Sequence, residues 1–304
     1  MSGQRPSHGE ASCRRGRVAA GLLLLWLVLP SARAAPTAEP EWHTLTRPGV
    51  RIRYRAGQAA VADRAAAAAA EAITRAGREL GIAPERAITV VLHPTHRDFG
   101  RAVGLGRREL VVGIAAGAHD VAHVDASGAI AGLPRLVAHE VAHLLLSQAV
   151  GAGVPRWFDE GYAEHVSGSP EWAARERLAE GSGTRRLFRL AELEQHFPRA
   201  GEEAAIAYAQ AHSLVAYLLK QSPPEALAHL VRQMRAGKAF PEALVAATGR
   251  DAAQWEAAWR RDLHGGSRWQ PWILFAAGAS GITMALLCLL AFRAMQKRKE
   301  CLPD

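Results

Sequence analysis

The feature that most constrains this chain is a short motif in which two histidines stand four residues apart, His139-Glu140-Val141-Ala142-His143. On an α-helix, residues at this spacing lie on one face about one turn apart. The two imidazoles can therefore bind the same metal ion. Glu140 lies beside the first histidine, and its carboxylate reaches the edge of such a site, where a bound water would lie. The spacing predicts a metal site with Glu140 as a general base.

The residues around the motif favour a buried helix. Leu133 and Pro134 open the segment, and most of the residues that follow, as far as Leu146, are apolar. Ionisable groups that are buried without partners cost several kcal/mol, and a shared metal ion removes much of that cost. The alternative is that His139 and Glu140 make ordinary hydrogen bonds, because so short a motif also arises by chance.

A catalytic zinc ion takes three protein ligands and keeps a fourth position open. Glu160 is the candidate for the third ligand, with sixteen residues between it and His143, on a second predicted helix (157–166). Glu164 lies one turn further along that helix. Its carboxylate can accept the other ring N–H of His139, as groups behind metal ligands commonly do. The alternative for Glu164 is a solvated surface carboxylate.

A longer pattern extends the motif. The HExxH sequence is followed by Pro155-Arg156-Trp157-Phe158-Asp159-Glu160-Gly161-Tyr162-Ala163-Glu164. Together they resemble the gluzincin metallopeptidases, and in particular the bacterial peptidase MA-like domains. In those domains a Pro-x-Trp-x-x-Glu-Gly-x-Ala-Glu stretch follows the HExxH helix. The segments 208–218 and 237–263 are similar to those domains as well.

The resemblance covers most of residues 42–264 and is most specific across 137–164. It implies that the two histidines of the motif and Glu160 are zinc ligands and that Glu140 is the base. The interval between the second histidine and Glu160 is shorter than in thermolysin or the alanyl-type aminopeptidases. The substrate-binding residues of those enzymes therefore cannot be carried over.

Two further side chains are candidates for a role beside the metal. Tyr208 and His212 lie one turn apart on a predicted helix (203–220) that should border the site. A phenol or an imidazolium there could stabilise the oxyanion of a tetrahedral intermediate, as gluzincins usually arrange, and Tyr208 is the catalytic candidate. The alternative is a tyrosine capped in the core and a histidine on the surface.

The histidine spacing recurs at His119 and His123, with Asp120 in place of the glutamate. This segment lies among Gly and Ala next to predicted strands, where residues four apart do not converge as they do on a helix. We interpret it as a chance repeat of the spacing and not as a second metal site.

Charge and cysteine usage argue against a nucleic-acid partner and against cysteine metal ligands in the main domain. Of the formal net charge of +8, residues 1–35 contribute +4 and residues 267–304 contribute +3, so about +1 remains for 36–266. We therefore expect no basic face on the main domain and no nucleic-acid partner. All three cysteines lie outside residues 36–266, so any metal there must be held by His, Asp or Glu.

Both ends of the chain carry membrane-related patterns. Residues 1–35 are typical of a secretory signal, with a basic stretch, an apolar run and an Ala-x-Ala cleavage site. Residues 272–292 form 21 residues without a charge, long enough to span a membrane. Basic residues follow in 293–304, and the positive-inside rule makes that tail cytoplasmic. We predict a single-pass protein of the cell membrane whose domain, 36–266, is extracytoplasmic; the alternatives are an uncleaved N-terminal anchor and a buried core helix.

Residue patterns predict an α+β domain in which a small β-rich part precedes a helical, zincin-like half. Strands are expected at 50–54, 87–92, 110–115 and 121–124. Helices are expected at 59–80, 133–149, 157–166, 203–220, 224–236, 239–247 and 252–263. The HExxH helix should lie at the cleft between the two parts.

These patterns together predict a membrane-anchored, extracytoplasmic zinc metallopeptidase that hydrolyses peptide bonds in a peptide or protein substrate through a zinc-bound water. Two alternatives stay open. One is a zinc-binding but non-catalytic adaptor domain of the cell envelope, and the other is a metal-free scaffold.

Overall fold

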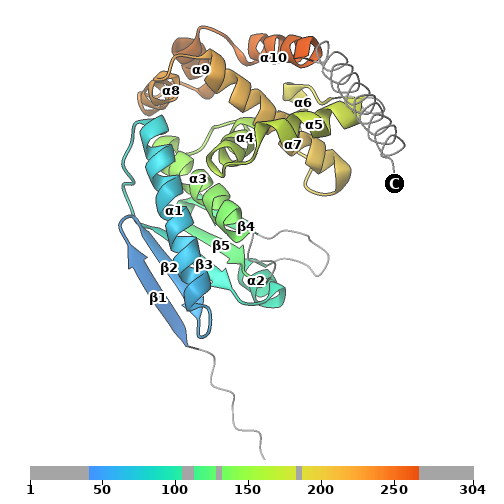
Figure 1. The fold of residues 1–304 in the computed structure, drawn as a ribbon. Coiled ribbons are helices and arrows are strands. Elements are labelled where there is room, and N and C mark those ends of the chain that lie inside the picture. Colours follow the sequence, from blue (N-terminus) through green and yellow to red (C-terminus); the bar gives the residue numbers. More distant parts are fainter. Residues whose placement is uncertain (1–40, 105–112, 128–131, 183–186, 267–304) are drawn as a thin grey trace, which may run out of the picture. The chain divides into compact units, whose positions relative to one another are not determined.

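The computed structural model describes residues 41–104, 113–127, 132–182 and 187–266 (Figure 1). A five-stranded sheet comes first, and its strands lie in the spatial order β1-β2-β3-β5-β4. The strands are β1 (Trp42–Arg47), β2 (Val50–Arg55), β3 (Ile88–His93), β4 (Gly113–Ala116) and β5 (Val121–Asp125). Strands β2, β3 and β5 run parallel, whereas β1 and β4 pair antiparallel at the two edges.

Two long helices, α1 (Ala59–Leu80) and α3 (Leu133–Val150), pack on one face of the sheet (Figure 1). Alternate strand residues, including Val50, Ile52 and Val90, are buried beneath them. The buried side of α1 consists mostly of alanines: Ala62, Ala65, Ala66, Ala69, Ala72 and Ala76. Because alanine adds only a methyl group, α1 can lie close to both the sheet and α3.

The other face of the sheet carries one short helix, α2 (His96–Val103). The Thr95 hydroxyl caps it by accepting a hydrogen bond from the Asp98 N–H at 3.1 Å. Phe99 is its buried residue and packs edge-on against His93 at the end of β3, with ring centroids 5.9 Å apart. This contact fixes α2 on the outer face.

The rest of the described chain is helical. The helices are α4 (Arg156–Val166), α5 (Glu171–Ser182), α6 (Leu190–Gln195), α7 (Gly201–Gln221), α8 (Ala226–Arg235), α9 (Phe240–Thr248) and α10 (Ala252–Gly266). Helix α4 contacts α3 and α7. Its Trp157 and Phe158 meet Phe240 of α9 in the core. This packing brings the helix that carries Glu160 beside the HExxH helix.

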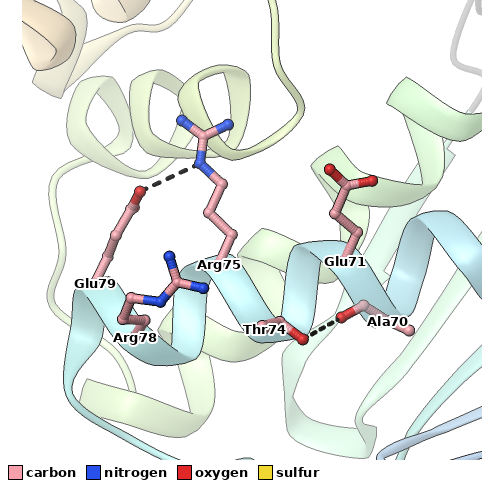
Figure 2. Close-up of a pocket in the computed structure, with 6 residues that line it drawn as sticks. All are labelled: Ala70, Glu71, Thr74, Arg75, Arg78 and Glu79. Atoms are coloured by element: carbon pink, nitrogen blue, oxygen red, sulfur yellow. Dashed lines mark hydrogen bonds and ion pairs between the residues drawn. The ribbon is translucent and has the colours of Figure 1, made fainter.

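A polar cluster ties the C-terminal end of α4 to α1. The Arg75 guanidinium donates to the Val166 carbonyl at 3.4 Å and lies 3.2 Å from the Glu79 carboxylate. The same carboxylate oxygen lies 3.2 Å from His165 Nε2. Figure 2 shows the Arg75–Glu79 pair on the side of α1, beside a shallow cavity of about 600 Å³. The cluster fixes the position of α4 relative to the sheet.

The predicted α+β class is confirmed, because a sheet comes first and a helical half follows. The helix expected at 59–80 has those bounds. The sequence patterns missed β1, α2, α5 and α6, and each has a weak apolar signal. Strand β1 is held by its hairpin with β2. Helix α2 buries one residue, Phe99. The one large aromatic side chain of α5, Trp172, is 68% exposed. Strand β4 was expected at 110–115 and is described only from Gly113 onward.

No helix within the described ranges is long and apolar enough to cross a membrane. The predicted signal (1–35), the predicted span (272–292) and the predicted tail (293–304) lie outside the described residues.

The contact between α4 and α7 generates a stability prediction. A Cβ at Gly161 would collide with the backbone carbonyl of Ala211, so Gly161→Ala should force the two helices apart. Overpacking of this kind costs about 1–3 kcal/mol, and we expect a melting temperature several degrees lower in a thermal unfolding experiment. Gly132→Ala is the matched control, since a Cβ there meets nothing within 4 Å. Equal melting temperatures for the two variants would contradict the close approach.

Candidate metal centre

The histidines of the motif project from one face of α3 toward α4. The rings of His139 and His143 lie edge to face, with centroids 4.8 Å apart and an interplanar angle of 79°. Their Nε2 atoms are 3.2 Å apart. The spacing of one helical turn thus brings two nitrogen atoms to nearly the same point.

Glu160 reaches that point from α4. Its Oε2 lies 3.5 Å from Nε2 of His139 and 3.5 Å from Nε2 of His143. A tetrahedral zinc ion with bonds of about 2.0–2.1 Å needs ligand atoms about 3.3–3.4 Å apart. The three observed separations fit that triangle. Within the described residues, His139, His143 and Glu160 form a group of three possible ligands that could hold one metal ion.

Two carboxylates lie behind the histidines. Asp159 Oδ1 is 2.7 Å from His143 Nδ1, and Glu164 Oε1 is 3.5 Å from His139 Nδ1. When a carboxylate accepts from Nδ1–H, the ring keeps that proton on Nδ1 and leaves its Nε2 lone pair for a metal ion. Asp159 is placed to do this for His143, and Glu164 lies on the Nδ1 side of His139. A cation at the point where both Nε2 atoms meet the Glu160 carboxylate would take the place of the proton that these negative groups otherwise hold on His143.

Arg156 holds the other oxygen of Glu160. Its guanidinium donates to Oε1 at 2.9 Å from one turn earlier on α4, which leaves Oε2 for the shared point. The guanidinium also lies 5.4 Å from the centre of the Phe197 ring. Arg156 therefore fixes the rotamer of Glu160 so that one oxygen faces the histidines.

The electrostatics of the site favour positive charge. Burial opposes protonation of His143, but Asp159 and Glu160 outweigh it and raise the pKa of His143 well above its ordinary value. Burial alone would raise the pKa of Glu160, yet the two histidines lower it well below the usual range. The same groups that attract a proton attract a metal cation.

Glu140 lies on α3 between the sheet and the metal-ligand triangle. It is 6% exposed, and burial raises the pKa of its carboxyl above the ordinary value. The backbone of β4 passes directly beside it, because a Cβ at Gly113 would collide with the Glu140 carboxylate. The edge strand of the sheet and the predicted base are therefore in contact.

A family model described as the Peptidase MA superfamily matches residues 68–265. This chain belongs to the Peptidase MA superfamily. The match confirms the resemblance inferred from the HExxH and Pro-x-Trp-x-x-Glu-Gly patterns.

Solved structures resemble this member of the Peptidase MA superfamily over part of their length. The M1 zinc metallopeptidase from Deinococcus radiodurans is 18% identical with a TM-score of 0.44. A two-domain M1 zinc metallopeptidase mutant bound to L-tryptophan is 17% identical with a TM-score of 0.45. Each alignment covers 72% of this chain and 51% of the other, so the chain spans about half the length of these structures. No curated protein matches the chain.

Tyr208 and His212 of this Peptidase MA domain lie on α7 in different surroundings. Burial and the negative charge of Glu160 raise the pKa of Tyr208 to about 12, and its ring packs edge-on against Phe197. His212 is 4% exposed, so the alternative of a surface histidine is wrong. Burial lowers the pKa of His212, while the charge of Glu164 opposes this effect. A catalytic role for Tyr208 stays a prediction.

The repeat of the histidine spacing does not build a second site of the same kind. His119 ends a 3₁₀ turn (Gly117–His119), and His123 lies on β5. His123 Nδ1 instead lies 2.9 Å from His93 Nε2. The segment is a loop and a strand, which explains why the two histidines do not converge.

Sequence reasoning missed three residues of the centre. Asp159 precedes Glu160, and Arg156 stands four residues before it, a spacing that favours an ion pair on a helix. These two could have been found from the helical pattern. Gly113 had only the weak signal that a glycine inside a strand can mark a close approach of another group.

The carboxylates behind the histidines generate a prediction about metal affinity in this Peptidase MA domain. Removing a partner of a metal-binding histidine typically weakens metal binding about 10–100-fold. We expect Asp159→Asn to lower zinc affinity in that range, measured by competition with a chromogenic chelator. Glu164→Gln should act in the same direction through His139.

The control for both variants is Glu242→Gln, which changes an exposed carboxylate on α9. It should leave the affinity unchanged. Unaltered zinc affinity in both the Asp159 and the Glu164 variants would show that these carboxylates do not orient the histidines.

Proposed function

We propose that this protein is a zinc-dependent metallopeptidase with His139, His143 and Glu160 as the zinc ligands. The observation that carries the proposal is the triangle of two Nε2 atoms and one carboxylate oxygen, 3.2–3.5 Å apart, with Glu140 beside it. Membership of the Peptidase MA superfamily supports it. The absence of cysteine from residues 36–266 is consistent with a ligand set of His and Glu.

The chemistry follows from the groups around the triangle. A zinc ion held there would supply Lewis acidity for the scissile carbonyl and lower the pKa of the attacking water. The Glu140 carboxylate takes a proton from that water and passes it to the leaving amine nitrogen. Glu140 is buried beside the triangle, so its carboxyl can hold the proton between the two transfers without losing it to bulk water.

Tyr208 is the proposed oxyanion donor. A phenol with a pKa of about 12 keeps its proton at neutral pH, so it can donate a hydrogen bond to a developing negative charge. Tyr208 packs against Phe197, whose ring also meets the Arg156 guanidinium that bonds Glu160, and these contacts support a position near the metal ligands.

Strand β4 is the proposed platform for the substrate backbone. Among the described strands it pairs with β5 on one side only, so its other edge can add an extended peptide by backbone hydrogen bonds. Gly113 of β4 lies against Glu140. A peptide that lengthens the sheet at this edge would run beside the base.

We also propose that the domain is extracytoplasmic and held at the cell membrane by one C-terminal span. The secretory pattern of residues 1–35 and the uncharged stretch 272–292, followed by basic residues, support this topology.

The test of the metal site is elemental analysis of the purified full chain without added zinc. We expect one zinc per chain, lost in His143→Ala, because two ligands cannot hold the ion as tightly as three. A chain that stays metal-free after incubation with zinc at neutral pH would overturn the ligand assignment.

The test of the reaction is Glu140→Gln. This change keeps the size of the side chain but removes its basicity, so zinc content should be unchanged. Hydrolysis of peptide substrates should fall about 10²–10⁴-fold, the usual contribution of a general base. Full activity in the variant would remove Glu140 as the base. Zinc-loaded wild type without activity on any peptide tested would favour the adaptor alternative.

A further inference from the structure

The outer face of the sheet carries a row of arginines. Strand β2 alternates strictly, so that Val50 and Ile52 are buried under α1 while Arg51, Arg53 and Arg55 point to the opposite face. Arg51 and Arg53 are exposed, and Arg55 is half-buried. Among the described helices, α2 packs on this face, and it does so against β5 and β3. The arginines therefore form an accessible strip along one strand.

Small polar residues and one tryptophan adjoin this strip on the neighbouring strands. Thr46 and Thr44 of β1 lie opposite Arg51 and Arg53, and Trp42 lies opposite Arg55. The guanidinium carbons of Arg53 and Arg55 lie 5.1 and 4.0 Å from the centre of the Trp42 ring. Cation–π contact orders these two side chains without neutralising their charge.

No carboxylate of the described chain forms an ion pair with the three arginines. Two acidic side chains on this face already have partners: Asp125 is bound to His96 at 2.8 Å and to Ser127, and Asp98 of α2 accepts from the Thr95 hydroxyl. The charge of Arg53 reaches His123 across β3, where it adds to burial in lowering the pKa of that histidine. The strip is thus a local concentration of positive charge.

This strip contradicts the expectation that the main domain has no basic face. The net charge of about +1 for residues 36–266 does not show where the charges lie. Alternate side chains of a strand point to the same face, so the three arginines of β2 gather on one side of the sheet. Acidic residues that balance the total lie elsewhere, and four of them surround the metal centre: Glu140, Asp159, Glu160 and Glu164.

We infer that the arginine strip, Arg51, Arg53 and Arg55, binds the phosphate groups of anionic lipid headgroups. Side chains two residues apart on a strand are about 6.5–7 Å apart, so the strip presents three guanidiniums in a line on an open sheet face. Guanidinium matches phosphate oxygens in geometry and charge. A half-buried tryptophan beside the charges suits the boundary between water and lipid.

The same face is a poor match for single-stranded nucleic acid. Such sites stack successive bases on several exposed aromatic rings, whereas one ring adjoins this strip, the half-buried Trp42, and two guanidiniums already lie against it. The lipid inference concerns the face of the sheet opposite α1 and α3, and it does not depend on the proposed peptidase activity.

The test is arginine footprinting of the full chain with phenylglyoxal, read by mass spectrometry. The protein is incubated with phosphatidylcholine vesicles that contain or lack phosphatidylglycerol. We expect the modification rates of Arg51 and Arg53 to fall several-fold only with phosphatidylglycerol. Arg64, exposed on α1, should react at one rate throughout. Unchanged rates at Arg51 and Arg53, or an equal fall at Arg64, would overturn the inference.

Variants test whether the strip contributes to binding. Each arginine near an anionic surface raises the binding constant about five-fold, so R51E/R53E should weaken phosphatidylglycerol-dependent binding by more than ten-fold. K220E/K238E makes the same change in charge at exposed positions of the helical half and should bind as wild type does. Equal losses in both double variants would show an effect of net charge and reject the strip.

Two arms separate other sources of phosphate. The footprinting is repeated with inorganic phosphate and with single-stranded DNA in place of vesicles. If either slows the modification of Arg51 and Arg53 as much as the vesicles do, lipid is rejected as the occupant. Arg51 contacts neither Trp42 nor an acid in the described chain, so Arg51→Glu alone repeats the binding test if the double variant does not fold. A single variant that binds phosphatidylglycerol vesicles as wild type does would count against the inference.

Discussion

The centre of this domain depends on one electrostatic constraint, the convergence of two imidazole nitrogens and a carboxylate oxygen within 3.5 Å of one another. Three electron-pair donors repel one another unless positive charge lies between them. Their convergence is maintained by groups further out, since Asp159 holds His143 and Arg156 holds Glu160. The surrounding fold supplies the rigidity that this arrangement needs.

That rigidity comes from small residues at close helix contacts. The alanine side of α1 lets α3 lie near the sheet, and Gly161 lets α7 touch the backbone of α4. Polar ties act at the ends of the same elements. Arg75 bonds the last turn of α4, and Gln148 near the end of α3 donates to Asp120 at 2.8 Å in the turn before β5. The two ligand-bearing helices are thus fixed to the sheet and to each other.

The sequence was sufficient to predict those residues of the metal centre whose positions depend on local helix geometry. His139 and His143 are linked by helical period alone, and Glu160 stands out because it lies in an apolar stretch after a helix start. Gly113 could not be found in this way, because its proximity to Glu140 arises from the packing of α3 under β4, over a long separation in sequence. Strand β1 and helix α5 were missed for a related reason: tertiary contacts, and not an apolar stripe, hold them in place.

The distribution of the metal-site groups between α3 and α4 affects the domain as a whole. It carries Glu160, both carboxylates behind the histidines and the arginine that orients Glu160, whereas the histidines belong to α3 on the sheet side. A shift of α4 would remove all four groups together. A cation bound at the triangle would therefore act as a cross-link between the sheet and the helical half, and its binding energy would add to the cooperativity of folding. Metal occupancy would then raise the free energy of unfolding of the two halves together.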